Sequence, residues 1–326
     1  MYDTSENKEK IISRLEDCKK NCELSKYGWG EETIEILYDL STRGKMVRGS
    51  LLMDATEIMG GEEDSIHYAA ATELIHTGLL VHDDIIDRDE KRRGVDSVHV
   101  QFRSEEITDR QTENLAICAG DISYFTAYEI ISQASNLDSE ALSEFSSTFA
   151  RVGVGEMSDI VLSGRLETVE DEVLEIHRNK TACYTFAMPL KIASILAEGP
   201  ELEKLHEIGM KMGVLYQIRD DHLDIFSNED DTGKPVASDI QEGKKTLHTE
   251  ILREKTSAGE ELYEEKTVEE AREVVRKMEE SSVRKEVEKR IEARRAEVIE
   301  LIEGLENPEL RELLKDVLQL VIQREK

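Results

Sequence analysis

Apolar residues recur along most of the chain at the i, i+3, i+4 and i+7 spacing of an amphipathic helix. The pattern predicts one helix in EETIEILYDLSTRG that ends at Gly44, and another in GKMVRGSLLMDATEIMGG that runs to a break at Gly60-Gly61. No stretch shows the alternation of a convincing β-strand. The chain is therefore predicted to be all-α, with further helices over residues 65–88, 111–134, 138–163, 169–182, 184–198, 201–226 and 244–254.

The last part of the chain has a different composition. After residue 258, Glu, Lys and Arg dominate and Val, Ile and Leu are sparse, as in VRKEVEKRIEARRAEVIELIEGL. This pattern predicts amphipathic helices with charged outer faces, laid over the main bundle. Because no Pro/Gly/Ser-rich linker divides the sequence, we expect a single domain over residues 1–326. It would comprise a motif-bearing core at about 40–255 and charged C-terminal helices at about 258–326.

The charge of the chain limits its partners. Its 42 Lys and Arg against 72 Asp and Glu give a formal net charge of −30, which argues against nucleic acid or an anionic membrane. No run of about 20 apolar residues predicts a transmembrane segment. Four cysteines in a chain without a recognisable signal peptide predict reduced thiols and a cytoplasmic location.

Two aspartate-rich motifs stand out against this background. DDIID places Asp83, Asp84 and Asp87 after one apolar helical stretch, and DDHLD repeats the pattern with aspartates at 220, 221 and 224. The first and last aspartates of each motif share a helix face, where like charges repel each other. Solvated acidic faces would be the simplest explanation for one copy. Two copies favour a pair of carboxylate edges that hold hard cations such as Mg²⁺.

Basic residues lie near these motifs in an order that suggests diphosphate sites. Guanidinium forks and lysine ammonium groups complement phosphate oxygens, although any one of them alone is more often a surface charge. The candidates are Lys45 and Arg48 at a helix start, Arg92 and Arg93 after the first motif, Lys180 beside Thr181, and Lys234 in DTGKPVASDIQEGKKT.

Over roughly residues 40–255 the chain resembles the trans-isoprenyl diphosphate synthases of the polyprenyl synthase family. GKMVR is similar to the family's GKxxR, and ELIHTGLLVHDDIIDRDEKRRG to its first aspartate-rich region. AGDIS, GEMSDI, NKTACYTF, LYQIRDDHLD and TGKPVASDIQEGKKT follow in the family's order. The sequence departs from the usual pattern at Glu156 for Gln, Tyr216 for Phe, Gly49 for Pro, and VDSVH for xPTxH. These departures bear on the subfamily more than on the activity.

The resemblance implies a bundle of antiparallel helices around a deep central cavity, the isoprenoid synthase fold. It also implies head-to-tail prenyl transfer, in which an allylic diphosphate ionises and isopentenyl diphosphate attacks the carbocation. The family's cofactor is Mg²⁺, with roughly three ions per active site, which stabilise the charge that develops on the leaving diphosphate. A homodimer is the expected assembly.

Roles for individual residues follow from the same resemblance. Asp83, Asp87 and Asp220 would be direct Mg²⁺ ligands, and Asp84, Asp221 and Asp224 would support the hydration of the metals. Arg92, Lys180 and Lys234 would hold the allylic diphosphate, whereas Lys45, Arg48, His76 and Arg93 would hold isopentenyl diphosphate. Gln217 and Thr181 would line the reacting carbons, and Lys244 would close a lid near the second metal site. For His76, a buried structural histidine is the alternative.

Product length is predicted from the helix that carries Asp83. In the family, short products go with bulky aromatic residues four or five positions before the first aspartate, where this chain has Leu79 and Gly78. Glycine has no side chain to block the growing tail, although it can equally permit close helix packing. The floor of the cavity would then lie deeper, and geranylgeranyl diphosphate (C20) is the expected product, with C25 or longer and farnesyl diphosphate as alternatives. Candidate floor residues are Leu74, Ile75, Tyr124, Phe125 and Tyr128.

Three other functions compete with the synthase. A class I terpene cyclase also ionises an allylic diphosphate, but it needs no second diphosphate site such as Lys45, Arg48 and Arg93 would form. A non-catalytic subunit of a synthase could lose metal ligands, yet both motifs are complete. A structural acidic bundle would explain the charge but not the ordered motifs.

Overall fold

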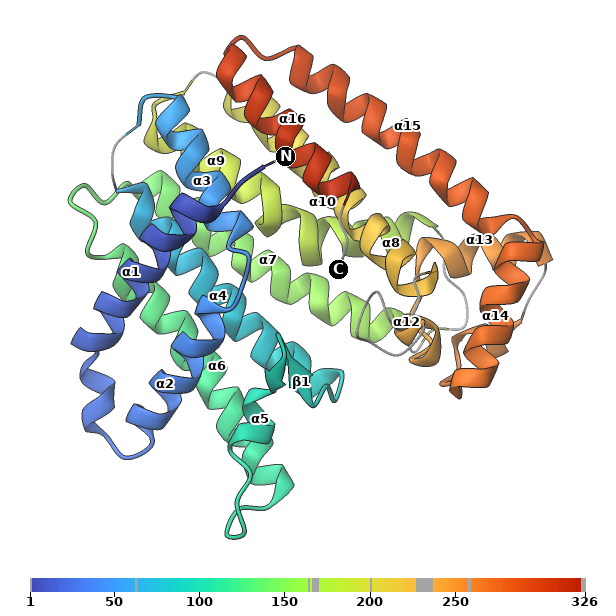
Figure 1. The fold of residues 1–326 in the computed structure, drawn as a ribbon, viewed down its shortest axis with the longest axis horizontal. Helices are drawn as coiled ribbons and strands as arrows, with labels where there is room; N and C mark the ends of the chain where they lie inside the picture. Colours follow the sequence, from blue (N-terminus) through green and yellow to red (C-terminus); the bar gives the residue numbers. More distant parts are fainter. Residues whose placement is uncertain are drawn as a thin grey trace. The chain divides into compact units, whose positions relative to one another are not determined.

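The computed structural model describes residues 2–61, 64–163, 165, 170–199, 201–226, 237–256 and 259–323. Helices make up most of this part of the chain (Figure 1), which confirms the all-α prediction. The chain divides into two compact units. The N-terminal unit comprises Asp3–Leu142 and Ile195–Glu198, and the C-terminal unit comprises Met1–Tyr2, Ser143–Ser194 and Gly199–Lys326. The expectation of a single domain stays a prediction.

The N-terminal unit is built around helix α4. This helix is buried along most of its length, which accounts for its apolar and small residues on all sides. It packs against α1, α2, α3, α5 and α6. The elements of this unit outside the hairpin are α1 (Ser5–Asn21), η1 (Glu23–Lys26), α2 (Gly30–Thr42), α3 (Val47–Ile58), α4 (Ser65–Ile86), α5 (Val98–Gln101) and α6 (Asp109–Ile131).

Gly49, on α3, explains one departure from the family pattern. Its backbone N–H donates a 3.0 Å hydrogen bond to Oε1 of Glu73, a buried carboxylate on α4. Proline has no N–H and would leave this buried acceptor without the bond. The helix contact α3–α4 therefore uses a donor that the usual family residue lacks.

A short hairpin follows α4. Strands β1 (Lys91–Arg92) and β2 (Val95–Asp96) pair antiparallel, with Lys91 opposite Asp96 and Arg92 opposite Val95. Arg93 and Gly94 form the turn with φ of 52° and 79°, the left-handed pair of a type I′ turn. The expectation that the chain has no strand is wrong at this point. Two residues per strand are too few to show alternation in the sequence.

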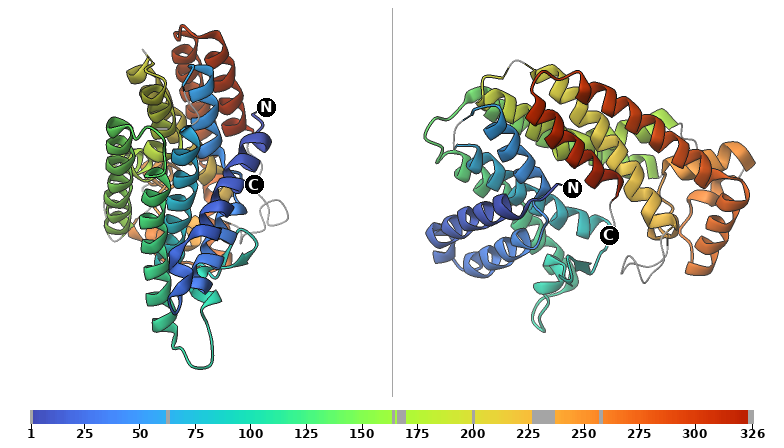
Figure 2. Two further views of the ribbon diagram at one scale, coloured as in Figure 1. Left: turned by 90° about the vertical axis from the view of Figure 1, so that its left-hand side faces the viewer. Right: turned by 45° about the horizontal axis from the view of Figure 1, so that its top comes forward.

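The C-terminal unit is built around helix α10. In Figures 1 and 2, α10 lies beside the last two helices, α15 and α16. The predicted charged helices are present, and α14 buries Ala271, Val274 and Met278 while its other faces are charged. The elements are α7 (Ser139–Ser163), α8 (Glu170–Ile176), η2 (His177–Ala187), α9 (Met188–Leu196), α10 (Leu202–Phe226), α12 (Ser238–Gln241), α13 (Leu247–Thr256), η3 (Glu260–Tyr263), α14 (Val268–Glu280), α15 (Val283–Glu303) and α16 (Pro308–Ile322).

Element η2 is a π-helix that runs without a break between α8 and α9. The sequence predicted two helices meeting at residue 183, and that break is wrong. Hydrogen bonds from i to i+5 widen each turn, so the apolar residues fall out of the 3.6-residue period. Two glycines on α10 allow η2 and α10 to pack in direct contact. A Cβ on Gly213 would lie 2.3 Å from Cα of Ala182 on η2, and one on Gly209 would lie 2.5 Å from Cα of Ala187.

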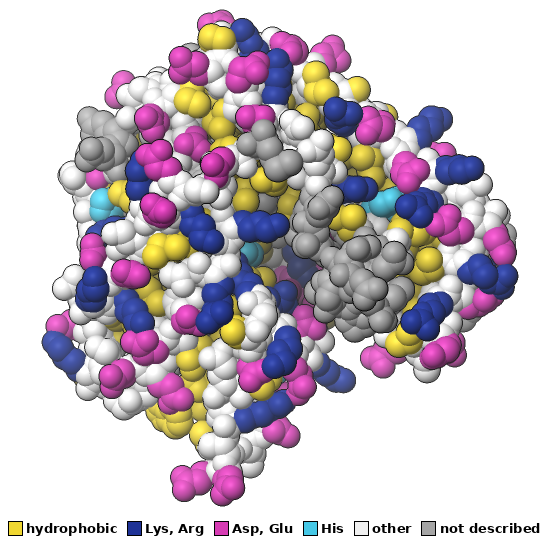
Figure 3. Space-filling view, viewed as in Figure 1, with side chains coloured by type: hydrophobic (Ala, Val, Ile, Leu, Met, Phe, Trp, Pro, Cys, Tyr) yellow, Lys and Arg dark blue, Asp and Glu magenta, His cyan; other side chains and the backbone are white. Residues whose placement is uncertain are grey.

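Acidic and basic side chains are interspersed over the face drawn in Figure 3. Across the described residues, every helix is too short or too polar to cross a membrane.

Candidate functional site

The first aspartate motif occupies the C-terminal end of α4. Asp83 and Asp84 lie in its last turn, and Asp87 caps it, with its backbone N–H donating a 2.8 Å hydrogen bond to the carbonyl of Asp83. The C-terminal end of a helix carries the negative pole of its dipole, and the last turn holds no basic residue. Carboxylates at this end are therefore unfavourable unless a cation joins them.

One such cation comes from the hairpin. Nε of Arg92 donates a 2.6 Å hydrogen bond to Oδ1 of Asp84, which is fully buried. Nη2 of the same guanidinium lies 3.0 Å from Asp89 and 3.8 Å from Asp83. Arg92 thus places one positive charge beside Asp83 and Asp84 of the first motif. Its predicted contact with a diphosphate, and the predicted metal ligands, stay predictions.

The four residues expected to hold isopentenyl diphosphate all lie in the N-terminal unit. The guanidinium of Arg93 lies against Gly44, where a Cβ would be 3.0 Å from Nη2, and Nη1 donates a 2.7 Å bond to the carbonyl of Leu40. Burial lowers the pKa of His76 well below its usual value, and the charges of Arg48 and Arg93 add to the effect. His76 is therefore neutral at pH 7. Lys45, next in sequence to Gly44, is exposed.

Two non-glycine residues beside this basic cluster adopt the left-handed backbone conformation. Met46 begins α3 with φ of 52°, and Arg93 has the same φ in the hairpin turn. Such residues cost about 1–3 kcal/mol each and tend to occur at functional sites, where surrounding contacts hold them. Met46 adjoins Lys45, and Arg93 is itself one of the residues expected to bind phosphate.

The second aspartate motif lies in the last two turns of α10, again without a basic residue in the final turn. Asp224 accepts hydrogen bonds from Oγ of Ser238 at 2.6 Å and from the backbone N–H of Asp239 at 3.0 Å. It thereby caps α12. Asp239 and Glu242 contact Lys244, at 3.8 Å and 2.8 Å.

Asp221, 4% exposed, is the most buried carboxylate of this motif among the residues whose exposure is given. Oδ1 accepts a 2.8 Å hydrogen bond from Nε2 of Gln217. Oδ2 accepts none from the described residues and lies 3.4 Å from Nε2 of His177. Burial raises the pKa of Asp221 well above its usual value, and the negative charge of Asp239 adds to the effect.

The predicted pair Thr181 and Gln217 is brought together, because η2 and α10 touch at their glycine positions. Oγ1 of Thr181 donates a 2.9 Å hydrogen bond to Oε1 of Gln217. Since the amide NH₂ of Gln217 faces Asp221, the carbonyl oxygen must face Thr181. The orientation of the amide is thus fixed by its two neighbours.

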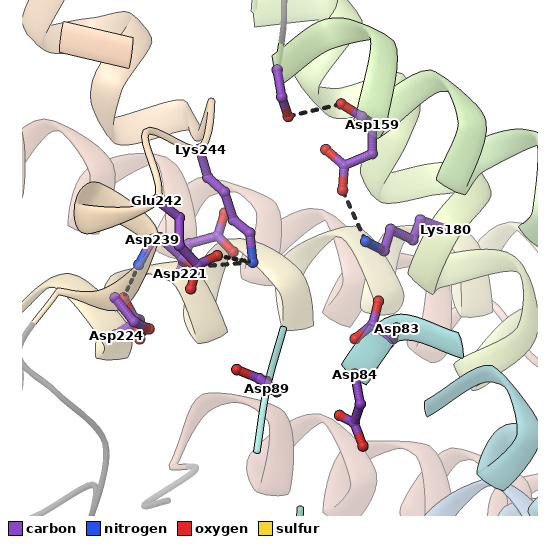
Figure 4. A network of polar contacts seen from close by, with 12 residues as sticks. Asp83, Asp84, Asp89, Asp159, Lys180, Asp221, Asp224, Asp239, Glu242 and Lys244 are labelled. Atoms are coloured by element: carbon purple, nitrogen blue, oxygen red, sulfur yellow. Dashed lines mark hydrogen bonds and ion pairs between the residues drawn. The ribbon is translucent and has the colours of Figure 1, made fainter. Parts of the chain in front are cut away.

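Lys180 lies on the same π-helix and contacts two carboxylates of α7. Its Nζ is 2.8 Å from Oε2 of Glu156 and 2.9 Å from Oδ2 of Asp159. Figure 4 shows the ammonium group pointing toward Asp159, and Lys244 pointing toward Asp239 and Glu242. Lys234 lies outside the described residues.

Three residues of this site escaped the sequence analysis as functional candidates. His177 lies beside Asp221, and Asp159 forms an ion pair with Lys180. Asp239 donates a backbone hydrogen bond to Asp224 and contacts Lys244 through its carboxylate. The sequence does point to Asp159, because it lies one helical turn after Glu156 in GEMSDI and so shares a face with it. Asp239 lies within a motif that was quoted, but only its lysines were singled out.

The residues predicted to set product length lie on α4 and α6. A Cβ on Gly78 would lie 1.9 Å from Oγ of Ser123 and 2.7 Å from the ring of Tyr124, so this glycine supports the close-packing interpretation. Phe125 is 76% exposed, which does not favour it as a floor within one chain. Leu74 and Ile75 are buried, whereas Leu79, Tyr124 and Tyr128 are partly buried. Their roles stay predictions.

The residues present fit a hard divalent cation. The aspartates of both motifs offer carboxylate oxygens, and Oδ2 of Asp221 is a buried acceptor for which the described residues supply no hydrogen bond. Within the described part of the chain, no three Asp, Glu, His or Cys side chains are grouped to hold a metal by themselves. Mg²⁺ suits such a site, since it is usually bound by one or two carboxylates and keeps water or phosphate oxygens in its other positions.

Comparisons with known proteins agree with this geometry. The "Short chain isoprenyl diphosphate synthase" of Methanothermobacter thermautotrophicus is 38% identical over 213 residues, covering 64% of this chain and 62% of that protein. The "Geranylgeranyl diphosphate synthase" of Saccharolobus solfataricus is 34% identical, covering 63% and 61%. The chain thus matches less than two thirds of the length of these relatives.

A solved structure extends the likeness to the whole chain. Geranylgeranyl pyrophosphate synthase from Corynebacterium glutamicum, in complex with isoprenyl diphosphate and magnesium, superposes with a TM-score of 0.88. The superposition covers 99% of this chain and 100% of that one at 23% identity, which shows a common fold. Residues 31–281 match the sequence profile of the Polyprenyl synthetase family. The chain therefore belongs to the polyprenyl synthetase family.

Proposed function

We propose that the chain is a trans-prenyltransferase. It condenses isopentenyl diphosphate with an allylic diphosphate and yields an all-trans polyprenyl diphosphate. The observation that carries this proposal is the pair of aspartate clusters, each at the C-terminal end of a helix, with Arg92 paired to Asp84 in the first and Lys244 paired to Asp239, the neighbour of Asp224, beside the second. The names of relatives 34–38% identical to this chain support the same reaction.

The cofactor would be Mg²⁺, roughly three ions per active site, which would supply positive charge to the leaving diphosphate when bound. Asp83, Asp87 and Asp220 would hold it. Lys180 and Lys234, with Arg92, would bind the allylic diphosphate. The guanidinium groups of Arg48 and Arg93, with Lys45, would bind isopentenyl diphosphate through charge-assisted hydrogen bonds, and neutral His76 can add one N–H.

Thr181 and Gln217 would line the reacting carbons. Each keeps an oxygen lone pair beyond the hydrogen bond between them, and such an oxygen can face a developing carbocation. Asp221 would hold the amide of Gln217 in the orientation that this requires. Lys244, held by Glu242 and Asp239, would close the second metal site.

The proposed product is geranylgeranyl diphosphate, C20. Leu74 and Ile75, buried below the aspartates on α4, support a floor deeper than the level of Leu79. The Saccharolobus relative carries the name of a C20 synthase. A longer C25 product is the second candidate, since another relative, from Natronomonas pharaonis, is a "Geranylfarnesyl diphosphate synthase" at 32% identity.

We also propose that the protein works as a homodimer in the cytoplasm. Helix α7 exposes an apolar stripe, and Val154, Met157 and Val161 are 59%, 67% and 57% exposed. Their i, i+3, i+7 spacing puts them on one face, and an exposed apolar stripe of this kind marks an interaction surface. A second copy, placed by a two-fold axis, would cover it. All four cysteines are thiols, which fits a reducing compartment.

One assay tests the function. Radiolabelled isopentenyl diphosphate is incubated with dimethylallyl, geranyl, farnesyl or geranylgeranyl diphosphate, with Mg²⁺ or with EDTA, and the products are separated by chain length. We expect Mg²⁺-dependent incorporation that ends at C20. Conversion of an allylic diphosphate to a hydrocarbon without incorporation of isopentenyl diphosphate would identify a terpene cyclase instead. Binding of both substrates without turnover would identify a non-catalytic subunit.

A further inference from the structure

Lys180 lies between two carboxylates although it carries one positive charge. Glu156 and Asp159 are three residues apart on α7, and their oxygens lie 2.8 Å and 2.9 Å from the Lys180 ammonium. The side chains of Glu156, Asp159 and Lys180 keep 22%, 29% and 26% of their surface exposed. They are therefore only partly screened by water.

The backbone fixes this arrangement. A Cβ on Gly155 would lie 2.7 Å from the backbone nitrogen of Lys180, so α7 and η2 are in direct contact. Nε of Arg151 donates a 2.5 Å hydrogen bond to Oδ1 of Asn179, which ties the two helices together at the preceding residue. Lys180 can leave its carboxylates only by rotating its side chain.

Carboxylate and phosphate oxygens compete for the same donors. A lysine ammonium has three N–H groups, and the two contacts on α7 engage two of them. The three charges sum to −1, so a diphosphate that approaches Lys180 meets net repulsion. One carboxylate is enough to orient the ammonium, since Asp159 would still lie 2.9 Å away without Glu156.

We propose that Glu156 sets the affinity of the allylic diphosphate site: its charge competes with diphosphate for Lys180, weakens substrate binding and favours release of the diphosphate product. This inference rests on the proposed function, and it concerns a residue at which the chain departs from the family's usual glutamine. Glu156 acts through Lys180 and is a specificity-determining residue rather than a catalytic one.

The test is Glu156→Gln, which keeps the size and an acceptor oxygen and removes the charge. We expect the KM for the allylic diphosphate to fall by a factor of about 1.5 to 5, which corresponds to the roughly 0.2–1 kcal/mol of a partly exposed ion pair that no longer competes. The KM for isopentenyl diphosphate should not change. Glu144→Gln is the matched control, since Glu144 lies on α7 like Glu156 and makes a 2.7 Å pair with Lys191 of α9. It should leave both constants unchanged.

Binding of inorganic pyrophosphate gives a readout that does not depend on turnover. Calorimetry with and without Mg²⁺ should show tighter binding to Glu156→Gln than to the wild type, by a factor similar to the fall in KM. Tighter pyrophosphate binding in a protein that transfers no prenyl group would uphold the role of Glu156 and reject the proposed function. Unchanged or weaker binding, or a raised allylic KM in an active enzyme, would show that Glu156 orients Lys180 and would overturn the inference. Melting curves confirm that each variant is folded.

Discussion

Asp221→Asn should make the metal-free protein more stable at alkaline pH. The carboxylate is 4% exposed, and its two nearest donors, Gln217 at 2.8 Å and His177 at 3.4 Å, carry no compensating charge. Burial lowers the pKa of His177 to about 4, so its imidazole is neutral. Asparagine keeps the acceptor for Gln217, and the neutral imidazole of His177 can shift its proton to Nδ1 and accept from the new amide.

The pH dependence follows from the raised pKa of Asp221. Below the unfolded value of 3.8 the carboxyl is protonated in both states and costs nothing. As pH rises through the higher folded pKa, the folded state must either keep a proton or bury a charge, and stability is lost. The gain from Asp221→Asn should therefore be absent near pH 4 and complete at alkaline pH.

The stability gained by Asp221→Asn can be estimated from the cost of burying Oδ2 of Asp221 without a hydrogen bond. Leaving a buried polar group unsatisfied costs about 1–3 kcal/mol, and more for a charge. At roughly 2–4 °C per kcal/mol for a unit of this size, the melting temperature in EDTA at pH 8.5 should rise by about 2–12 °C. Mg²⁺ with pyrophosphate should then stabilise the wild type more than the variant.

The assay is a series of thermal melts from about pH 4 to about pH 9, in EDTA and in Mg²⁺ with pyrophosphate. Asp224→Asn is the contrast, because Asp224 accepts two hydrogen bonds from Ser238 and Asp239, and an amide would turn an NH₂ toward one of those donors. That variant should be less stable in both conditions. If Asp221→Asn melts below the wild type at pH 8.5 in EDTA, the carboxylate is held by a favourable interaction and our account of its burial is wrong.

The remaining predictions use activity and stability together. Asp83→Ala and Asp220→Ala should each reduce kcat by several orders of magnitude with the fold retained, because charge stabilisation of the leaving group is lost; near wild-type turnover would reject them as metal ligands. Arg93→Ala should mainly raise the KM for isopentenyl diphosphate and Lys180→Ala that for the allylic substrate, and the reverse pattern would exchange the two sites. Gly78→Phe should lower the melting temperature along with any shift toward C15, since its Cβ alone would lie 1.9 Å from Oγ of Ser123; an unchanged melting temperature would show that the α4–α6 contact yields easily.

The sequence predicted most helices because their apolar faces recur with the helical period. It also singled out Thr181 and Gln217, which hydrogen-bond to each other in the structure although they are 36 residues apart. Both came from the family resemblance, because no local pattern links two positions on different helices, and their role at the reacting carbons stays a prediction.

What the sequence could not predict depends on contacts between distant segments. The partners of Asp221 include His177, which is 44 residues away and whose neighbours in the chain give no sign of the contact. The π-helix was not predicted for a related reason: it lies close against Gly209 and Gly213 on α10, which are distant in the sequence. Hydrophobic period alone assigns such a segment to two ordinary helices.

Gly78 supports one conclusion in the sequence and the opposite conclusion in the structure. In the sequence, a missing side chain five positions before Asp83 suggested open space for a growing chain. In the structure that space belongs to α6, because Oγ of Ser123 and the ring of Tyr124 occupy the place where a Cβ would lie. Tyr124 is held there in turn, with its hydroxyl 3.2 Å from Nδ1 of His82. Since helix packing already fills the position, the glycine carries no information about cavity depth. We therefore expect the limit on product length to come from other side chains, of which Leu74 and Ile75, deeper on α4, are buried candidates.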